Sequence, residues 1–135
     1  RGRERMADGQ HFDGGRAVGW MQIGPRADVP EWNNKGRVSA PAEDVDAADA
    51  GVWAISCFFL HTGARGKGLT HQLVAAGIAH AGENGARLLE ACPMRQSKDS
   101  RSIGLYVGSA RVFEKAGFAV VAERKAGRPL MRLEL

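Results

Sequence analysis

The strongest constraint on the fold is a nearly continuous apolar run that leads through a glycine-rich turn into a helix. Residues 51–60 read Gly-Val-Trp-Ala-Ile-Ser-Cys-Phe-Phe-Leu, and such a run is typical of a strand buried on both faces. A turn at 61–68 follows, and Asn84-Gly85 supplies a C-terminal stop for the next segment. Between the turn and the stop, apolar residues recur at helical spacing: Leu69, Leu73, Val74, Ile78 and Ala81.

A second short strand completes a βαβ unit. Residues 86–92 are mostly apolar, and Pro93 ends them. Strand, helix and strand in this order predict two parallel strands that are joined by a right-handed crossover.

Further strands are predicted on both sides of this unit. Residues 16–24 alternate apolar and polar positions behind an Asp-Gly-Gly turn at 13–15, which predicts a strand with a short partner around His11–Phe12. Near the end of the chain, residues 118–123 and 129–134 predict a hairpin.

The remaining segments read as loops and one short helix. A proline-punctuated loop runs from 25 to about 50, and a polar loop covers 94–104. A helix is expected over about 105–116, closed by Gly117 at the C′ position. The order of elements predicts an α/β or α+β fold with a mixed central sheet, and the length of 135 residues suits a single domain.

Composition and charge exclude several classes of protein. The net charge of +4 is scattered among acidic residues, which argues against specific nucleic-acid binding. No apolar stretch approaches the length of a membrane-spanning helix. Cys57 and Cys92 form no CxxC pair, so neither a metal site nor a disulfide framework is expected, and a reducing, cytoplasmic setting fits best.

The glycine-rich turn is the segment that suggests chemistry. Residues 63–70 read Gly-Ala-Arg-Gly-Lys-Gly-Leu-Thr, between a buried strand and a helix. Glycines allow the backbone to approach a ligand, and the first N–H groups of the helix favour a phosphate or pyrophosphate. The Walker pattern fails because Gly68 follows Lys67, and the Rossmann pattern fails at His71. A turn that starts a helix and binds nothing is the alternative.

Two motifs in this order resemble the GNAT acetyltransferase superfamily. Residues 63–68 match the glycines of its pyrophosphate loop, [QR]xxGx[GA], and depart from it at Gly63. Residues 112–118, Val-Phe-Glu-Lys-Ala-Gly-Phe, match its second signature, (F/Y)-E-K-x-G-F. The resemblance extends to a bacterial subgroup with Trp-x-x-x-Cys-Phe-Phe at 53–59 and Glu-x-x-Pro at 90–93. It covers residue 12 to the end, so the first strand and helices of the family are expected to be absent or reduced to their last part.

The resemblance implies a fold and an acyl donor. The parallel strands at 51–60 and 86–92 are expected to splay apart, with the pantetheine arm of acetyl-CoA in the cleft between them. The backbones of Phe58 and Leu60 would pair with the pantetheine, and the N–H of Phe58 would polarise the thioester carbonyl. Other implied contacts to acetyl-CoA come from the turn, the helix that follows it and the second signature: Arg65, Gly66, Lys67, Gly68, Leu69, Thr70, Tyr106 and Phe113.

The implied reaction is direct attack of a primary amine on the thioester carbon, followed by loss of the CoA thiolate. Glu90 is the candidate base, and a structural Glu90 paired with Arg87 or Arg95 is the alternative. Many family members protonate the thiolate with a tyrosine in the position of Phe113, so here water, Tyr106 or no group serves. A covalent route through Cys57 or Cys92 is disfavoured, because buried cysteines are seldom nucleophiles.

Two other functions stay open. The first alternative is a GNAT-like module that binds acyl-CoA without turnover, and the second is a basic nucleic-acid-binding domain. The amine acceptor is not specified, although the acidic residues at 43–49 are expected to attract a cationic one. The closing hairpin mediates dimers in members of the family, which makes a homodimer an option.

Overall fold

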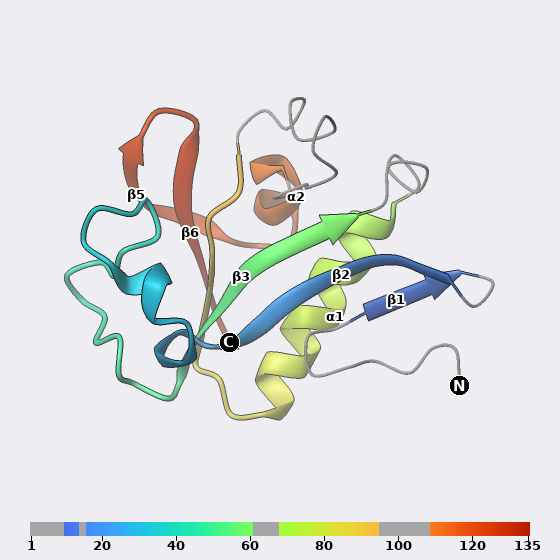
Figure 1. Cartoon of the computed structure of the whole chain (residues 1–135), viewed down its shortest axis with the longest axis horizontal. Helices are drawn as coiled ribbons and strands as arrows, with labels where there is room; N and C mark the ends of the chain where they lie inside the picture. The colour runs from blue at the N-terminus through green and yellow to red at the C-terminus, as the bar shows by residue number, and fades with distance from the viewer. Residues whose placement is uncertain (1–9, 14–15, 61–67, 95–108) are drawn as a thin grey trace.

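The computed structural model describes residues 10–13, 16–60, 68–94 and 109–135. Six strands form one mixed sheet in the order β1-β2-β3-β4-β6-β5, as Figure 1 shows. The fold class predicted from the sequence is therefore confirmed. The strands are β1 (Gln10–Asp13), β2 (Arg16–Pro25), β3 (Val52–Leu60), β4 (Leu88–Ala91), β5 (Ala119–Lys125) and β6 (Arg128–Glu134).

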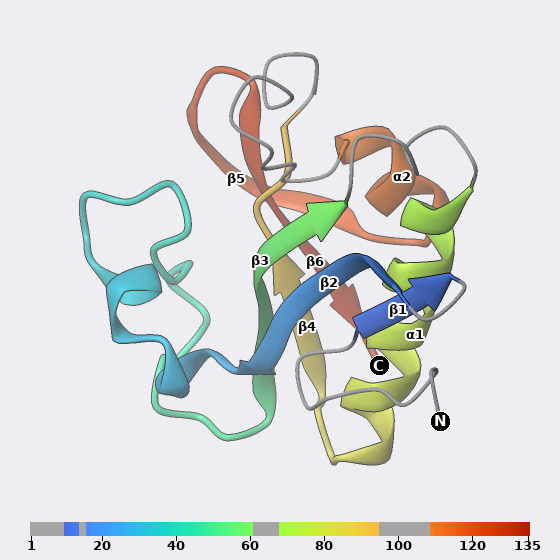
Figure 2. The same ribbon diagram turned by 45° about the vertical axis from the view of Figure 1, so that its right-hand side comes forward.

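The sheet has different cover on its two faces. Helices α1 (Leu69–Glu83) and α2 (Ala110–Lys115) pack on one face, and the long segment 26–50 lies on the other (Figure 2). That segment holds two short 3₁₀ helices, Arg26–Asp28 and Pro30–Asn33. Neither α1 nor α2 has the length and apolar character that crossing a membrane requires.

The βαβ unit is present as predicted. Strands β3 and β4 pair in parallel, and α1 connects them. Gly85 ends α1 with φ 86°, and the N–H of Ala86 donates to the carbonyl of Ala81 at 3.0 Å. Strand β4 is shorter than the predicted 86–92 because Ala86 is used in this helix cap.

The end of the chain also follows the prediction, with shifted boundaries. Ser109 caps α2 by accepting a hydrogen bond from the N–H of Arg111, so α2 begins at Ala110. The earlier part of the predicted helix, 105–108, lies outside the described ranges. Gly117 adopts φ 103° at the C′ position, where the sequence places it. Strands β5 and β6 pair antiparallel as the expected hairpin.

Two apolar clusters stabilise the sheet from its two sides. The larger cluster packs β2, β3 and β4 against α1 and α2, with Leu73, Val74 and Leu89 fully buried. The smaller one joins the segment 26–50 to the opposite face through Trp32, Ala54, Cys92 and Leu130. The segment predicted as a plain loop is thus packed onto the sheet.

A bulge in the pairing of β3 with β2 lies half-way along β3, at the point where the ladder between β3 and β4 ends. Gln22 of β2 lies opposite Cys57, and Ile23 lies opposite Ile55, so Ser56 is an extra residue in β3. The parallel ladder with β4 also ends at Ile55, which lies opposite Ala91. Because a bulge bends its strand, the remainder of β3 runs on without β4 as its neighbour. The end of the ladder at Ile55, while β3 continues to Leu60, agrees with the predicted divergence of β3 and β4.

Candidate active-site cleft

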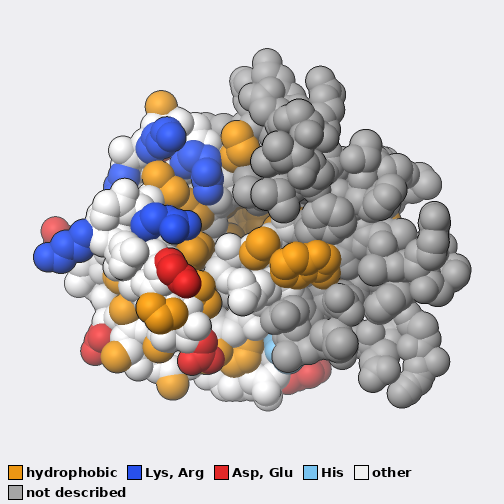
Figure 3. Space-filling view, in the orientation of Figure 1, with side chains coloured by type: hydrophobic (Ala, Val, Ile, Leu, Met, Phe, Trp, Pro, Cys, Tyr) orange, Lys and Arg blue, Asp and Glu red, His pale blue; other side chains and the backbone are white. Residues whose placement is uncertain are grey.

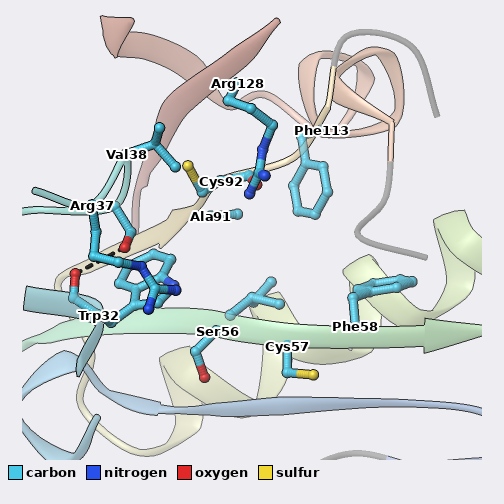
Figure 4. A pocket seen from close by; sticks show the side chains of 12 residues that line it. Trp32, Arg37, Val38, Ser56, Cys57, Phe58, Ala91, Cys92, Phe113 and Arg128 are labelled. Atoms are coloured by element: carbon cyan, nitrogen blue, oxygen red, sulfur yellow. Dashed lines mark hydrogen bonds between the residues drawn. The ribbon is translucent and has the colours of Figure 1, made fainter. Parts of the chain in front are cut away.

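A pocket of about 160 Å³ opens where the β3–β4 ladder ends. Figure 4 shows that β3 forms its floor through Ser56, Cys57 and Phe58. Ala91 and Cys92, from the end of β4, line it from the other side. The pocket therefore lies at the bulge of β3, at the point where β4 ends.

One end of the pocket is aromatic. Phe58 and Phe113 are buried, with ring centroids 6.4 Å apart and planes at 70°. Phe118 packs edge-on against Phe113 at 5.1 Å and fixes the orientation of that ring. The sequence placed Phe58 and Phe113 in a common cleft, and the structure brings them together. Phe113 cannot donate a proton.

The other end of the pocket is basic. Arg37, Trp32 and Val38 reach it from the segment 26–50 (Figure 4). Arg128, from the start of β6, enters the pocket between this end and Phe113. No sequence pattern indicates a site role for these four side chains, because three lie in the irregular segment 26–50 and Arg128 is the first residue of a strand. Their presence depends on how the segment 26–50 folds over the sheet.

In the chain, α1 is the next helix after β3: β3 ends at Leu60, and α1 begins at Leu69. Gly68 is its N-cap with φ 76°, a conformation that L side chains rarely adopt. No side chain of the described residues caps this end, so the first N–H groups and the positive end of the helix dipole remain available to an anion. Leu69 and Thr70 begin the helix. The predicted residues Arg65, Gly66, Lys67 and Tyr106 lie outside the described part of the chain.

Glu90, the candidate base, is completely buried and paired with two arginines. Its Oε1 accepts a hydrogen bond from Nη1 of Arg26, which is also completely buried. Its Oε2 lies 2.9 Å from Nε of Arg132. Glu90 is not among the residues that line the pocket. Its carboxylate joins the segment 26–50 to strands β4 and β6.

The arginine partners differ from those suggested by the sequence. Arg87 pairs with Asp49 at 2.7 Å and not with Glu90, and Arg95 lies outside the described residues. Arg26 also donates to the carbonyl of Ser39 and, through Nε, to Asn33 Oδ1 at 2.8 Å. The guanidinium group is therefore held in place by several partners.

Two of the acidic residues at 43–49, Asp44 and Asp49, form ion pairs. Asp44 accepts two hydrogen bonds from Arg132, at 2.9 and 3.0 Å, and these bonds lower the pKa of its carboxyl. The hydrogen bond from Arg87 likewise lowers the pKa of Asp49. Both carboxylates are partly neutralised by their partners, which weakens the expected attraction of a cationic acceptor.

The two cysteines contribute to the pocket in different ways. Cys92 is buried, and burial raises the pKa of its thiol, while the nearby Arg128 partly counters this effect. A thiol that stays protonated is a poor nucleophile. Cys57 is half-buried on β3. Within the described ranges, no group of three or more His, Cys, Asp and Glu side chains is placed to hold a metal ion.

Comparisons with known proteins agree on the type of fold. The family model described as "Acetyltransferase (GNAT) family" matches residues 6–118. No curated protein matches the chain.

Solved structures of GNAT proteins resemble the model over most of its length. The GNAT domain of S. lividans PAT is 18% identical with a TM-score of 0.59, and the match covers 93% of this chain and 58% of that one. The structure of yncA, a putative acetyltransferase from Salmonella typhimurium with acetyl-CoA, is 19% identical (TM-score 0.57; 93% and 62% covered). The PaiA N-acetyltransferase from Thermoplasma acidophilum in complex with coenzyme A is 11% identical (TM-score 0.56; 93% and 58% covered). The chain thus spans about three fifths of these proteins, and at these identities the likeness concerns the fold.

Proposed function

The chain belongs to the GNAT acetyltransferase family, and from this premise we propose that it transfers an acetyl group from acetyl-CoA to a primary amine. The observation that carries the proposal is the pocket at the point where β3 and β4 separate, close in the chain to the start of α1, which no described side chain caps. Two of the solved relatives are described with acetyl-CoA or coenzyme A. We also propose that residues 1–135 form one domain.

In this proposal acetyl-CoA lies beside the part of β3 that extends beyond its ladder with β4. The backbones of Phe58 and Leu60 pair with the pantetheine amides, because this part of β3 has passed the end of its ladder with β4. The pyrophosphate binds to the backbone N–H groups around the start of α1. The residues proposed for this are Arg65, Gly66, Lys67, Gly68, Leu69 and Thr70. Phe113 packs against the sulfur end, and Tyr106 lies beside the pantetheine.

The proposed chemistry is direct transfer. The neutral amine nitrogen attacks the thioester carbon, and the N–H of Phe58 stabilises the oxyanion that develops. The C–S bond then breaks, the amine nitrogen loses a proton, and the CoA thiolate gains one. The product is an amide.

The proton carriers stay predictions, with Glu90 as base and Tyr106 as acid. Glu90 has no exposed surface, and each of its carboxylate oxygens already accepts a hydrogen bond from an arginine. An ammonium could therefore reach it only through a relay. These facts support the alternative in which Glu90 is structural.

A second function is favoured by the same observations. Phe113 occupies the position of the usual tyrosine, and Glu90 is enclosed by Arg26 and Arg132. A domain that binds acyl-CoA without turnover would need neither an acid nor a base. The formation of free CoA separates the two functions, since an enzyme releases it faster when a suitable amine is present.

The first experiment is a calorimetric titration with acetyl-CoA. We compare the parent with Gly68→Asp and Gly85→Asp, which place the same side chain at similar positive φ angles, 76° and 86°, at opposite ends of α1. Both changes strain the backbone, but only Gly68→Asp puts negative charge where the pyrophosphate is proposed to bind. We expect Gly68→Asp to abolish binding and Gly85→Asp to retain it. Equal binding to all three proteins would exclude the start of α1 as the pyrophosphate site.

A further inference from the structure

Two arginines point into the pocket, without a carboxylate among the described residues that line it. Figure 4 shows the guanidinium groups of Arg37 and Arg128 directed into the space between β3 and the β5–β6 hairpin. The described residues that line this space include neither Asp nor Glu. Figure 3 shows Lys and Arg side chains gathered over the hairpin and the segment 26–50. The pocket is therefore suited to an anionic group.

Arg128 has an unused donor inside the protein. Its Nη2 donates to the carbonyl of Cys92 at 3.0 Å, which orients the guanidinium group. Its Nε is buried and has no hydrogen-bond partner among the described residues. A buried donor without a partner is unfavourable, and a ligand with an acceptor oxygen would remove this cost.

The neighbouring arginines do not share this property. Arg26 pairs with Glu90, and Arg132 pairs with both Glu90 and Asp44. Arg124 donates to three backbone carbonyls, at 2.8 to 3.2 Å. The structure thus provides partners for the other arginines of this face and directs the remaining two toward the pocket.

The position of the arginines indicates which part of the pocket binds the acceptor and which part binds the acyl donor. Phe58 and Phe113 line the end of the pocket near the C-terminal end of β3, after which α1 begins. Arg37 lines the opposite end, beside Trp32, and Arg128 lies between this end and Phe113 (Figure 4). With the thioester at the aromatic end, as the proposed function requires, the basic end faces the incoming amine.

We propose that the acceptor is a small primary amine that carries a carboxylate, as an amino acid does, and that Arg37 and Arg128 bind this carboxylate. The inference rests on the proposed function. Two guanidinium groups match the two oxygens of a carboxylate. The volume of about 160 Å³ is below the range of roughly 300–1,000 Å³ for larger ligands, which favours a small acceptor.

The test measures binding of matched pairs of amines. Amino acids with uncharged side chains are titrated into the protein, both alone and with CoA present. Each is compared with its carboxamide, so that members of a pair differ only in the carboxylate. We expect the amino acids that bind best to bind about tenfold or more tightly than their amides, as charge-assisted hydrogen bonds imply. If no amino acid binds more tightly than its amide, the proposal is overturned.

Arg37→Gln is the decisive variant, because Arg37 is exposed and its removal should not disturb folding. Its control is Lys35→Gln, which removes an exposed cation two residues away that does not line the pocket. We expect Arg37→Gln to weaken amino-acid binding about tenfold and to leave amide binding unchanged. Lys35→Gln should change neither the binding of the amino acid nor that of its amide. An equal loss in both variants would indicate long-range attraction and would overturn the site. Arg128→Gln, in which the bond to the carbonyl of Cys92 is also at risk, should follow Arg37→Gln if it folds.

Two further results separate this inference from its alternatives. Succinyl-CoA carries a carboxylate on its acyl group. If Arg37→Gln weakens the binding of succinyl-CoA but not that of amino acids, the arginines bind an anionic acyl donor, and the proposal of an anionic acceptor fails. If amino acids bind in the predicted manner but acetyl-CoA neither binds nor reacts, the transferase function fails and the carboxylate site stands.

Discussion

The carboxylate of Glu90 connects three segments of the chain through two ion pairs. Arg26 brings the segment 26–50 and Arg132 brings β6, while Glu90 itself lies on β4. Removing the charge in Glu90→Gln leaves the completely buried Arg26 without its counter-ion. We expect the free energy of unfolding, measured in urea, to fall by about 3–5 kcal/mol.

A second variant separates this structural role from catalysis. In the double variant Glu90→Gln, Arg26→Gln, both buried charges are gone, and we expect much of the lost stability to return. If Glu90 is structural, the rate of acetyl transfer recovers together with stability. A rate that stays low in a stable double variant would instead support Glu90 as the base.

Phe113 allows a test for a gain of function. Phe113→Tyr introduces a hydroxyl at the aromatic end of the pocket, at the position where the resemblance to the family implies an acid. If the sulfur of CoA lies there, protonation of the thiolate becomes easier, and we expect kcat to rise by about tenfold or more while KM for acetyl-CoA stays similar. The matched control is Phe118→Tyr, because Phe118 packs against Phe113 but does not line the pocket. A change of similar size in both variants would argue against an acid at position 113.

At the scale of the elements, the sequence predicts best where the signal is local. Asn84-Gly85 and Gly117 end the two helices where expected, since a positive φ at the C′ position is a property of one residue. Strand β4 is shorter than predicted because Ala86 donates to Ala81 in the cap of α1. An apolar pattern cannot show that a residue is already used by the preceding helix.

The same substitution, Gly to Ala, is expected to change the free energy of unfolding in opposite directions at two glycines. Gly117 ends α2 at φ 103°, and an added Cβ would lie 3.3 Å from Cδ1 of Leu133. We expect Gly117→Ala to lower the free energy of unfolding by about 1–2 kcal/mol. Gly82 lies within α1 with open space around an added Cβ, and Gly82→Ala should raise it by about 0.5–1 kcal/mol. Thermal or urea unfolding of both variants checks the signs, and effects of equal sign would contradict the assigned helix end.

At the scale of the whole molecule, the mixed sheet and the cleft were predictable, but the basic end of the pocket was not. Phe58 and Phe113 follow from two sequence motifs that resemble a family. Arg37 and Arg128 are 91 positions apart in the numbering and line the same pocket only because the segment 26–50 folds over the sheet toward the hairpin. Such long-range pairing leaves no periodic trace in the sequence.

The ion pair between Asp44 and Arg132 predicts how the packing of this segment depends on pH. Arg132 lowers the pKa of Asp44 below its ordinary value of 3.8. The folded protein therefore keeps Asp44 charged at pH values where the unfolded chain has begun to bind a proton. The stabilisation is complete well above pH 3.8 and is lost as the pH falls through the lower pKa of the folded state.

Asp44→Asn tests this dependence. We expect the variant to be less stable than the parent at pH 7, with a difference that shrinks as the pH falls below 3.8 and that is smaller in high salt, because the pair is exposed. Urea midpoints from pH 7 to about 2.5 measure it. Glu43→Gln is the control, since Glu43 is exposed and has no ion pair with the described arginines. A difference between Asp44→Asn and the parent that does not change with pH would show that Asp44 acts through its shape and hydrogen bonds, and not through its charge.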